Sequence, residues 1–165
     1  MKKFGATGMK ILKTLHLIFV MLWTVGVIAM AILLLMKAQS GDELFMKYKA
    51  VRFIDDLIVI PTATITVLIG ILYGIKSNWG FFKYKWVTVK WIVSIIVIVV
   101  GTFYLSPMLD ANLELSDTQR NLAMSNAEMI SRENQIFYCG CISSITLILL
   151  VIISVFKPWK AKKKV

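Results

Sequence analysis

Four long apolar runs, separated by charged gaps, constrain the fold of this chain more than any other feature. The runs cover residues 14–36, 57–75, 86–105 and 137–156. Each is close to the ~20 apolar residues that an α-helix needs to cross the hydrocarbon core of a bilayer. The first run is too long for the apolar segment of a cleaved signal peptide, which covers about 7–15 residues. We therefore expect an all-α, integral membrane four-helix bundle that forms one domain over residues 1–165.

The amino-acid composition supports a membrane location. The 165-residue chain is 58% apolar and 17% charged, whereas soluble domains are about 45–50% apolar and about 25% charged. These values exclude an intrinsically disordered chain, a secreted disulfide scaffold and a soluble Rossmann-type enzyme. We expect a multi-pass protein of the cell membrane.

The distribution of lysines predicts the orientation in the membrane. The formal net charge is +10, and the N-terminal tail, the second gap and the C-terminal tail hold four, three and five lysines with no acidic residue. The other two gaps hold charges of both signs. The positive-inside rule therefore predicts that both termini are cytoplasmic. Anionic lipid headgroups are sufficient partners for these lysines, so we expect no nucleic-acid binding, and the sequence leaves a homo-oligomer open.

Two shorter patterns predict local structure in the gaps. Ser116 and Gln119 have the spacing of a capping box, which predicts a helix that begins there and continues into the fourth run. Asp55 and Asp56 stand at the start of the second run, where carboxylates favour a helix N-terminus. We interpret them mainly as capping residues, and the alternative is an entry site for a cation or a proton.

The second and third runs each have one side that carries their polar or small residues. Such sides are expected to face the bundle interior, because helix interfaces in membranes favour small and polar side chains. Gly70 and Gly74 allow either close contact between helices or room for a flat ligand. The inward sides are Asp56, Ala63, Thr66, Gly70, Tyr73 and Gly74 in the second run, and Trp86, Lys90, Ser94, Val97, Gly101 and Tyr104 in the third. In the first run, His16 shares its side with Val20, Trp23, Val27 and Met30.

His16 and Lys90 are the candidates for chemistry, because they lie within the runs. A charge in the centre of a spanning helix costs about 2.5–3.5 kcal/mol on the insertion scale, so such residues suggest a function. With the predicted orientation, His16 lies about 3 Å and Lys90 about 6 Å into the same leaflet, where they could share one site. The alternative is that His16 lies among the headgroups and that Lys90 extends to the cytoplasmic surface.

The segments LHLIFVMLWTVGVI and KWVTVKWIV, with the loop GFFKYKW between the second and third runs, resemble the HemJ and CopD group of small helical membrane proteins. The four-helix form is similar to haem-sensing membrane proteins of the HsmA type. The resemblance implies that the chain binds haem b, with His16 as the axial iron ligand and Lys90 as the second key residue, and that it protects against haem or oxidative stress. We add Trp86, Gly70, Gly74, Tyr73 and Trp23 as expected cofactor-binding residues.

The enzymatic role of such a haem protein depends on the sixth iron ligand. An open sixth position would permit one-electron chemistry with an oxidant such as superoxide. The resemblance makes protoporphyrinogen oxidation less expected, because the first run lacks the longer ending of HemJ-like proteins.

Two other functions stay open at this stage. A small transporter or efflux component could use His16, Lys90 and Asp56 as a proton relay, although the chain has no acidic residue at the middle of the membrane. A scaffold or regulator would need no cofactor. Cys139 and Cys141 do not form a zinc pattern, because no second pair or histidine is near, and we interpret them as thiols packed in the bundle.

Overall fold

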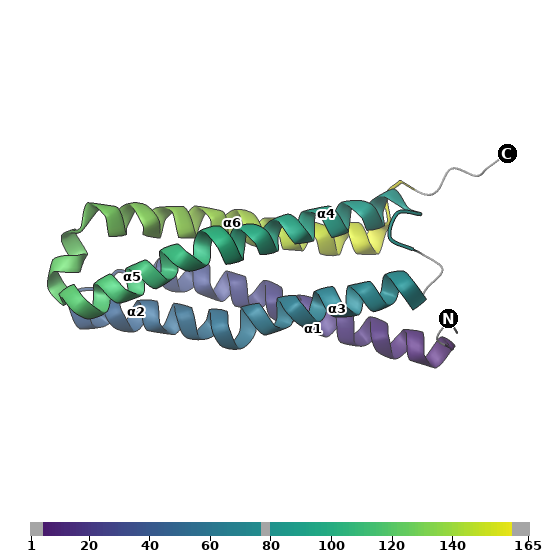
Figure 1. Ribbon diagram of the computed structural model, residues 1–165, viewed down its shortest axis with the longest axis horizontal. Helices are drawn as coiled ribbons and strands as arrows, with labels where there is room; N and C mark the ends of the chain where they lie inside the picture. Colours follow the sequence, from purple (N-terminus) through teal and green to yellow (C-terminus); the bar gives the residue numbers. More distant parts are fainter. Residues whose placement is uncertain (1–4, 77–79, 160–165) are drawn as a thin grey trace.

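The computed structural model describes residues 5–76 and 80–159, and the regular structure of these residues is entirely helical (Figure 1). The all-α class expected from the sequence is confirmed. In chain order the elements are α1 (Ala6–Leu34), α2 (Gly41–Ile54), the π-helical η1 (Asp55–Val59), α3 (Ile60–Lys76), α4 (Lys85–Val100), the π-helical η2 (Gly101–Leu105), α5 (Ser106–Gln119), the 3₁₀-helical η3 (Arg120–Ser125) and α6 (Ala127–Phe156).

These elements form four long helical rods, namely α1, α2–η1–α3, α4–η2–α5–η3 and α6. Within the described ranges, all four rods are long and apolar enough to cross a membrane. α1 packs along α3 and α6, and α4 packs against α6. The chain is therefore a multi-pass integral membrane four-helix bundle.

The two ends of the bundle differ in charge. The start of α1 and the end of α6 lie at the same end (Figure 1), as expected for termini on one side of a membrane. We call it the basic end, because six lysines of the described ranges lie there: Lys10, Lys13, Lys76, Lys83, Lys85 and Lys157. The opposite end, where η3 connects α5 to α6, is called the distal end. The cytoplasmic location of the basic end remains a prediction from the positive-inside rule.

The rods are longer than a bilayer is thick. The continuous helical rod Gly41–Lys76 has 36 residues, or about 54 Å at 1.5 Å per residue, whereas the hydrocarbon core measures about 30 Å. The distal half must therefore extend beyond the membrane. We call this part the distal bundle; it consists of α2, α5, η3 and the adjoining ends of α1 and α6.

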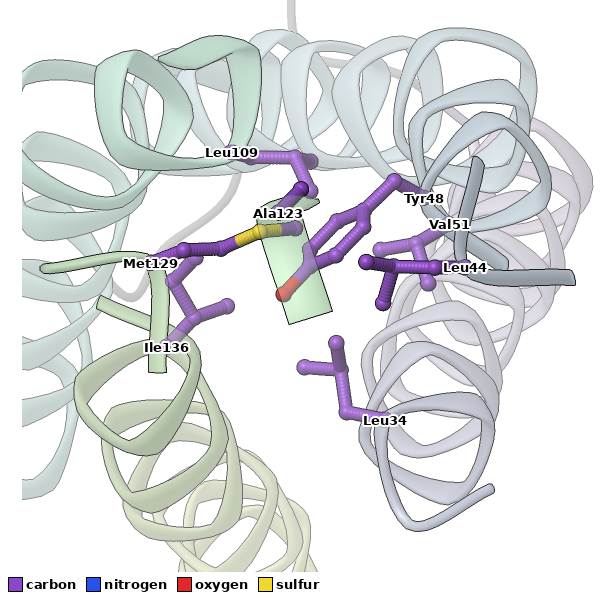
Figure 2. Close-up of a cluster of buried hydrophobic side chains, with 8 residues drawn as sticks. All are labelled: Leu34, Leu44, Tyr48, Val51, Leu109, Ala123, Met129 and Ile136. Carbon is purple, nitrogen blue, oxygen red and sulfur yellow. The ribbon is translucent and has the colours of Figure 1, made fainter. Parts of the chain in front are cut away.

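The distal bundle has its own hydrophobic core (Figure 2). Tyr48 and Val51 of α2 have no exposed surface, and Leu109 of α5 and Met129 of α6 are 2% exposed. The side chain of Tyr48 reaches across the cluster toward Met129 (Figure 2). Burying an apolar side chain of this size stabilises a fold by about 1.5–3 kcal/mol, so this core fixes α2, α5 and α6 against one another.

Buried polar contacts supplement this core. The Tyr48 hydroxyl donates a hydrogen bond to the Glu133 carboxylate, and Asn112 Nδ2 donates to the Tyr48 hydroxyl at 3.1 Å and to the Met129 carbonyl at 3.2 Å. Lys47 Nζ forms a salt bridge of 2.9 Å with Glu133. Burial raises the pKa of the Tyr48 hydroxyl, and the neighbouring Glu133 carboxylate raises that pKa further. Tyr48 therefore stays protonated and donates to Glu133.

The helix expected to begin at Ser116 begins instead at Ala127. Ser116 lies inside α5, and its hydroxyl donates to the Leu113 carbonyl at 2.7 Å rather than accepting at a helix start. The N-cap is Asn126, whose side chain accepts from the Met129 N–H at 3.0 Å. The capping-box spacing failed because a serine inside a helix can satisfy its hydroxyl on a preceding carbonyl. The continuation of this helix into the fourth span is confirmed.

The capping role expected for Asp55 and Asp56 is also wrong. The rod that contains them begins at Gly41, where the Ser40 side chain accepts from the Glu43 N–H at 3.3 Å. Asp55 and Asp56 lie within the rod, in the π-helical η1. The charged residues of α2 hid this continuation, because hydropathy marks where a helix enters the membrane and not where it begins.

The prediction of which side of the third span faces inward is right at the start of the span and wrong at its end. Trp86 is 7% exposed, whereas Ile92 and Ile96 on the opposite side are 53% and 54% exposed, as expected for lipid contact. Tyr104, expected inside, is 46% exposed, and its hydroxyl donates to Gln135 Oε1 at 2.6 Å. Tyr104 lies in η2, whose i→i+5 turns change the rotation per residue, so the 100° spacing no longer applies there.

Candidate functional site

His16 lies on α1 and faces α3 near the basic end of the bundle. A backbone group of Thr66 lies within hydrogen-bonding reach of the imidazole. The rings of His16 and Tyr73 have centroids 6.3 Å apart, and His16 Cε1 lies 4.0 Å from the point that a Cβ of Gly70 would occupy. The structure therefore places His16 beside three residues of the expected inward side of the second span.

One nitrogen of this imidazole is left without a partner. The Nδ1 atom of His16 is buried and has no hydrogen-bond partner among residues 5–76 and 80–159, and the same is true of the Thr66 hydroxyl oxygen. A buried polar atom without a partner costs about 1–3 kcal/mol, and such atoms in a native fold call for an explanation. The imidazole is thus able to bind an additional group.

Lys90 of α4 is the second candidate residue of this site. It is half-buried, and it lies close enough to His16 for the two side chains to interact electrostatically. The structure therefore places the two candidate residues, which come from separate helices, within electrostatic range of each other. A site with one imidazole and one ammonium group suits a ligand that has both a metal centre and a carboxylate.

Gly70 and Gly74 face aromatic rings of this chain. A Cβ at Gly70 would lie 3.4 Å from the ring of Trp91, and a Cβ at Gly74 would lie 2.4 Å from the ring of Phe81. The Phe81 and Trp91 rings are 5.3 Å apart between centroids. The two glycines therefore admit flat aromatic side chains between α3 and the start of α4.

Phe81 and Trp91 belong to this region but were not among the residues expected from the sequence. Helical spacing assigned the inward side of the third span to Lys90 and placed Trp91 one position away from it. Phe81 precedes α4, so it has no helical phase from which its direction could be predicted. The accumulation of aromatic residues in the segment GFFKYKW was the signal available for them.

Trp86 and Trp23 are both buried, in different places. Trp86 lies at the start of α4, is 7% exposed, and has its ring centroid 6.4 Å from that of Tyr84. Trp23 is 3% exposed and packs with Ala63 and Leu147. Trp23 lies seven residues beyond His16, or about 10 Å along α1, so it forms the next layer of the bundle rather than the surroundings of the imidazole.

Asp56 and the two cysteines lie apart from His16. Asp56 precedes Thr66 by ten residues, about 15 Å along the rod, and it is ion-paired with Arg52 at 3.3 Å. A relay through His16, Lys90 and Asp56 therefore gains no support from proximity. Cys139 and Cys141 are free, half-buried thiols in α6.

Protein side chains alone do not assemble a metal centre in the described part of the chain. There, no three histidine, cysteine, aspartate or glutamate side chains gather in a way that could hold a metal ion. A porphyrin differs from a free ion because it brings four nitrogen donors of its own and requires the protein to supply only axial ligands. The single imidazole of His16, whose buried Nδ1 atom has no partner among the described residues, fits that requirement.

Comparisons with known proteins identify the family. The family model described as "Predicted integral membrane protein (DUF2269)" matches residues 10–158. The chain matches no curated protein and no solved structure. The match covers all four spans, including His16 and Lys90. The chain therefore belongs to the DUF2269 family of predicted integral membrane proteins.

Proposed function

We propose that this integral membrane protein binds haem b near its basic end, with His16 as the axial ligand of the iron. The proposal rests on one observation, which is the buried Nδ1 atom of His16 that has no partner within residues 5–76 and 80–159. His16 is the single histidine of the chain. A ligand that needs one imidazole therefore suits this chain better than one that needs several.

The residues around His16 have separate roles in this proposal. The backbone of Thr66, which lies near the imidazole, would help to orient it, as outer contacts of a metal-bound histidine commonly do. The Lys90 ammonium binds a propionate carboxylate and compensates its charge. Trp91, next to Gly70, provides an aromatic surface on the α4 side.

Bound haem would supply one-electron redox chemistry, and the role that we propose is protection against haem or oxidative stress. His16 of α1, Thr66 of α3 and Lys90 of α4 would hold the haem in this chemistry. We propose superoxide as the small-molecule substrate of that chemistry.

Haem titration of the detergent-purified protein tests the proposal. We expect a Soret band that saturates at one haem per chain, and an affinity at least about tenfold lower in His16→Ala, since loss of an axial ligand removes the main specific contact. Leu17→Ala is the matched control, because Leu17 is the next residue of α1 and is 43% exposed on the lipid side. Equal haem affinity in His16→Ala and in the wild type would overturn the proposal.

A further inference from the structure

An apolar cavity of about 420 Å³ lies between the four spans, on the distal side of Trp23. Its walls come from Trp23 and Val27 of α1, Ala63 and Val67 of α3, Ile98 of α4 and Gly140 of α6. Neither His16 nor Lys90 lines it. Its size falls within the range of about 300–1,000 Å³ that is typical of small-molecule sites. The cavity is thus separate from the proposed haem site.

The two π-helical segments adjoin this cavity from opposite rods. Asp55 and Val59 of η1 and Gly101 and Leu105 of η2 all contribute to its lining. A Cβ added at Gly101 would meet no atom within 4 Å among the described residues. π-helical turns are rare and often occur at functional sites. Two of them beside one cavity indicate that the rods depart from regular helix at this place.

The distal end of the cavity carries negative charge. Arg52 is 3.3 Å from a carboxylate oxygen of each of Asp55, Asp56 and Asp110, so one positive charge faces three negative ones. Arg52 Nη1 also donates to the Ser106 hydroxyl at 2.8 Å. Asp55 is 9% exposed and lines the cavity, and none of the described lining residues is basic.

We propose that this cavity binds a lipophilic cation, whose apolar body fills the space between the spans and whose positive group lies beside Asp55. The apolar walls favour a ligand with a hydrophobic body, because binding removes the apolar surface of that body from water or headgroups. The excess of two carboxylates around Arg52 favours a positive group and disfavours an anion of the same shape. This inference does not rest on haem binding.

Two probes of equal shape and opposite charge test the proposal on detergent-purified protein without haem. Tetraphenylphosphonium and tetraphenylborate differ in the sign of their charge, and empty micelles correct for partition into detergent. We expect saturable binding of the phosphonium at one per chain and no saturable binding of the borate. Equal affinity for the two ions, or no saturable phosphonium binding, would overturn the proposal.

Variants then locate the probe. Asp55→Asn should lower phosphonium affinity about tenfold, as expected for loss of a charged partner. Ala63→Leu should abolish saturable binding, because Ala63 is a buried wall residue. Asp117→Asn is the matched control, since Asp117 is ion-paired with Arg120 in the distal bundle and does not line the cavity. Wild-type affinity in both Asp55→Asn and Ala63→Leu would show that the phosphonium binds elsewhere.

A measurement of helix content guards against misfolding. If Ala63→Leu does not keep the wild-type circular dichroism spectrum, Asp110→Asn is used in its place. This substitution removes one of the three carboxylates around Arg52, and the Asp110 side chain is 53% exposed. Asp110→Asn should weaken phosphonium binding less than Asp55→Asn does. The opposite order of the two variants would contradict the assignment of Asp55 to the site.

Discussion

The ring of His16 on α1 and the ring of Tyr73 on α3 lie 6.3 Å apart between centroids, at an interplanar angle of 57°. The Tyr73 hydroxyl donates to the Met9 carbonyl of α1 at 3.4 Å. α1 and α3 are thus joined on the basic side of the imidazole. On the distal side, the next layer is closed by Trp23, which is 3% exposed. His16 is therefore held between two helices rather than directed into lipid.

Lys90→Ala should lower haem affinity by about 10–100-fold, because a hydrogen bond to a charged group contributes about 1.5–3 kcal/mol. The physical reason is the loss of a partner for a propionate carboxylate. Haem dimethyl ester, which has no propionate charge, should bind Lys90→Ala and the wild type equally. Titration of both proteins with both porphyrins measures this difference. A loss of equal size for the ester would show that Lys90 acts on packing instead.

Glu133→Gln should destabilise the distal bundle. Lys47 is 7% exposed and loses its only charged partner among the described residues, and an uncompensated buried charge costs about 3–5 kcal/mol. Glu128→Gln is the control, because Glu128 is 70% exposed in its ion pair with Arg132 and such pairs contribute about 0–1 kcal/mol. Thermal unfolding in detergent compares the two variants. Equal midpoints would contradict the structural role of the Lys47–Glu133 pair.

Gly41→Ala should also destabilise the distal end. A Cβ at Gly41 would lie 2.4 Å from the backbone of Arg120 and Asn121, so α2 and η3 would have to separate. The Gly41 N–H would then lose its hydrogen bond of 2.6 Å to Asn121 Oδ1. We expect a loss of about 1–3 kcal/mol, as for overpacking. Gly5→Ala, where the added Cβ meets no described atom within 4 Å, should leave the unfolding midpoint unchanged.

Asp55, just outside the second span, should make stability depend on pH. The pKa of Asp55 is raised from 3.8 to about 6; burial is the largest cause, Arg52 lowers the pKa, and Asp56 and Asp110 raise it. The folded protein therefore binds the Asp55 proton more tightly than the unfolded chain. The free energy of unfolding should fall by up to about 3 kcal/mol as pH rises from about 4 to about 6. Asp55→Asn should remove this fall in the free energy of unfolding. The same pH dependence in the variant as in the wild type would contradict the role of Asp55.

The ionisation of Asp55 should also affect phosphonium binding in the cavity. Above a pH of about 6 the Asp55 carboxylate is ionised, so phosphonium binding should strengthen as pH rises through that value. The charged groups that face Asp55 are Arg52, Asp56 and Asp110. Phosphonium titrations at pH 5 and pH 7 compare the two states, with Asp55→Asn as the control. Stronger binding at the lower pH would contradict the proposed contact.

Hydropathy could predict the four spans, because lipid requires apolar side chains over a fixed length. It could not predict α2 or η1, since a helix outside the membrane carries charges such as Lys47 and Arg52 without penalty. The start of α6 at Ala127 was missed for a related reason, because capping signals recur inside helices. The distal bundle therefore had to come from the structure.

The candidate site was partly predictable. The depth predicted for His16 and Lys90 follows from helix rise and the predicted orientation, and in the structure Lys90 lies within electrostatic range of His16. The rings of Phe81 and Trp91 against Gly74 and Gly70 were not predictable, because they depend on the path of the loop before α4. The cavity was also unpredictable, since its lining comes from four rods and two π-helical segments.

The proposed ligation of haem by His16 is tested most directly by imidazole rescue. His16→Ala leaves a space of imidazole size beside Thr66 and Gly70, so free imidazole can replace the lost ligand. The measurement is the Soret spectrum of haem-loaded His16→Ala, recorded with and without imidazole. Haem ligation by His16 predicts that the wild-type spectrum is lost in the variant and restored by imidazole. A wild-type spectrum in His16→Ala without added imidazole would contradict it.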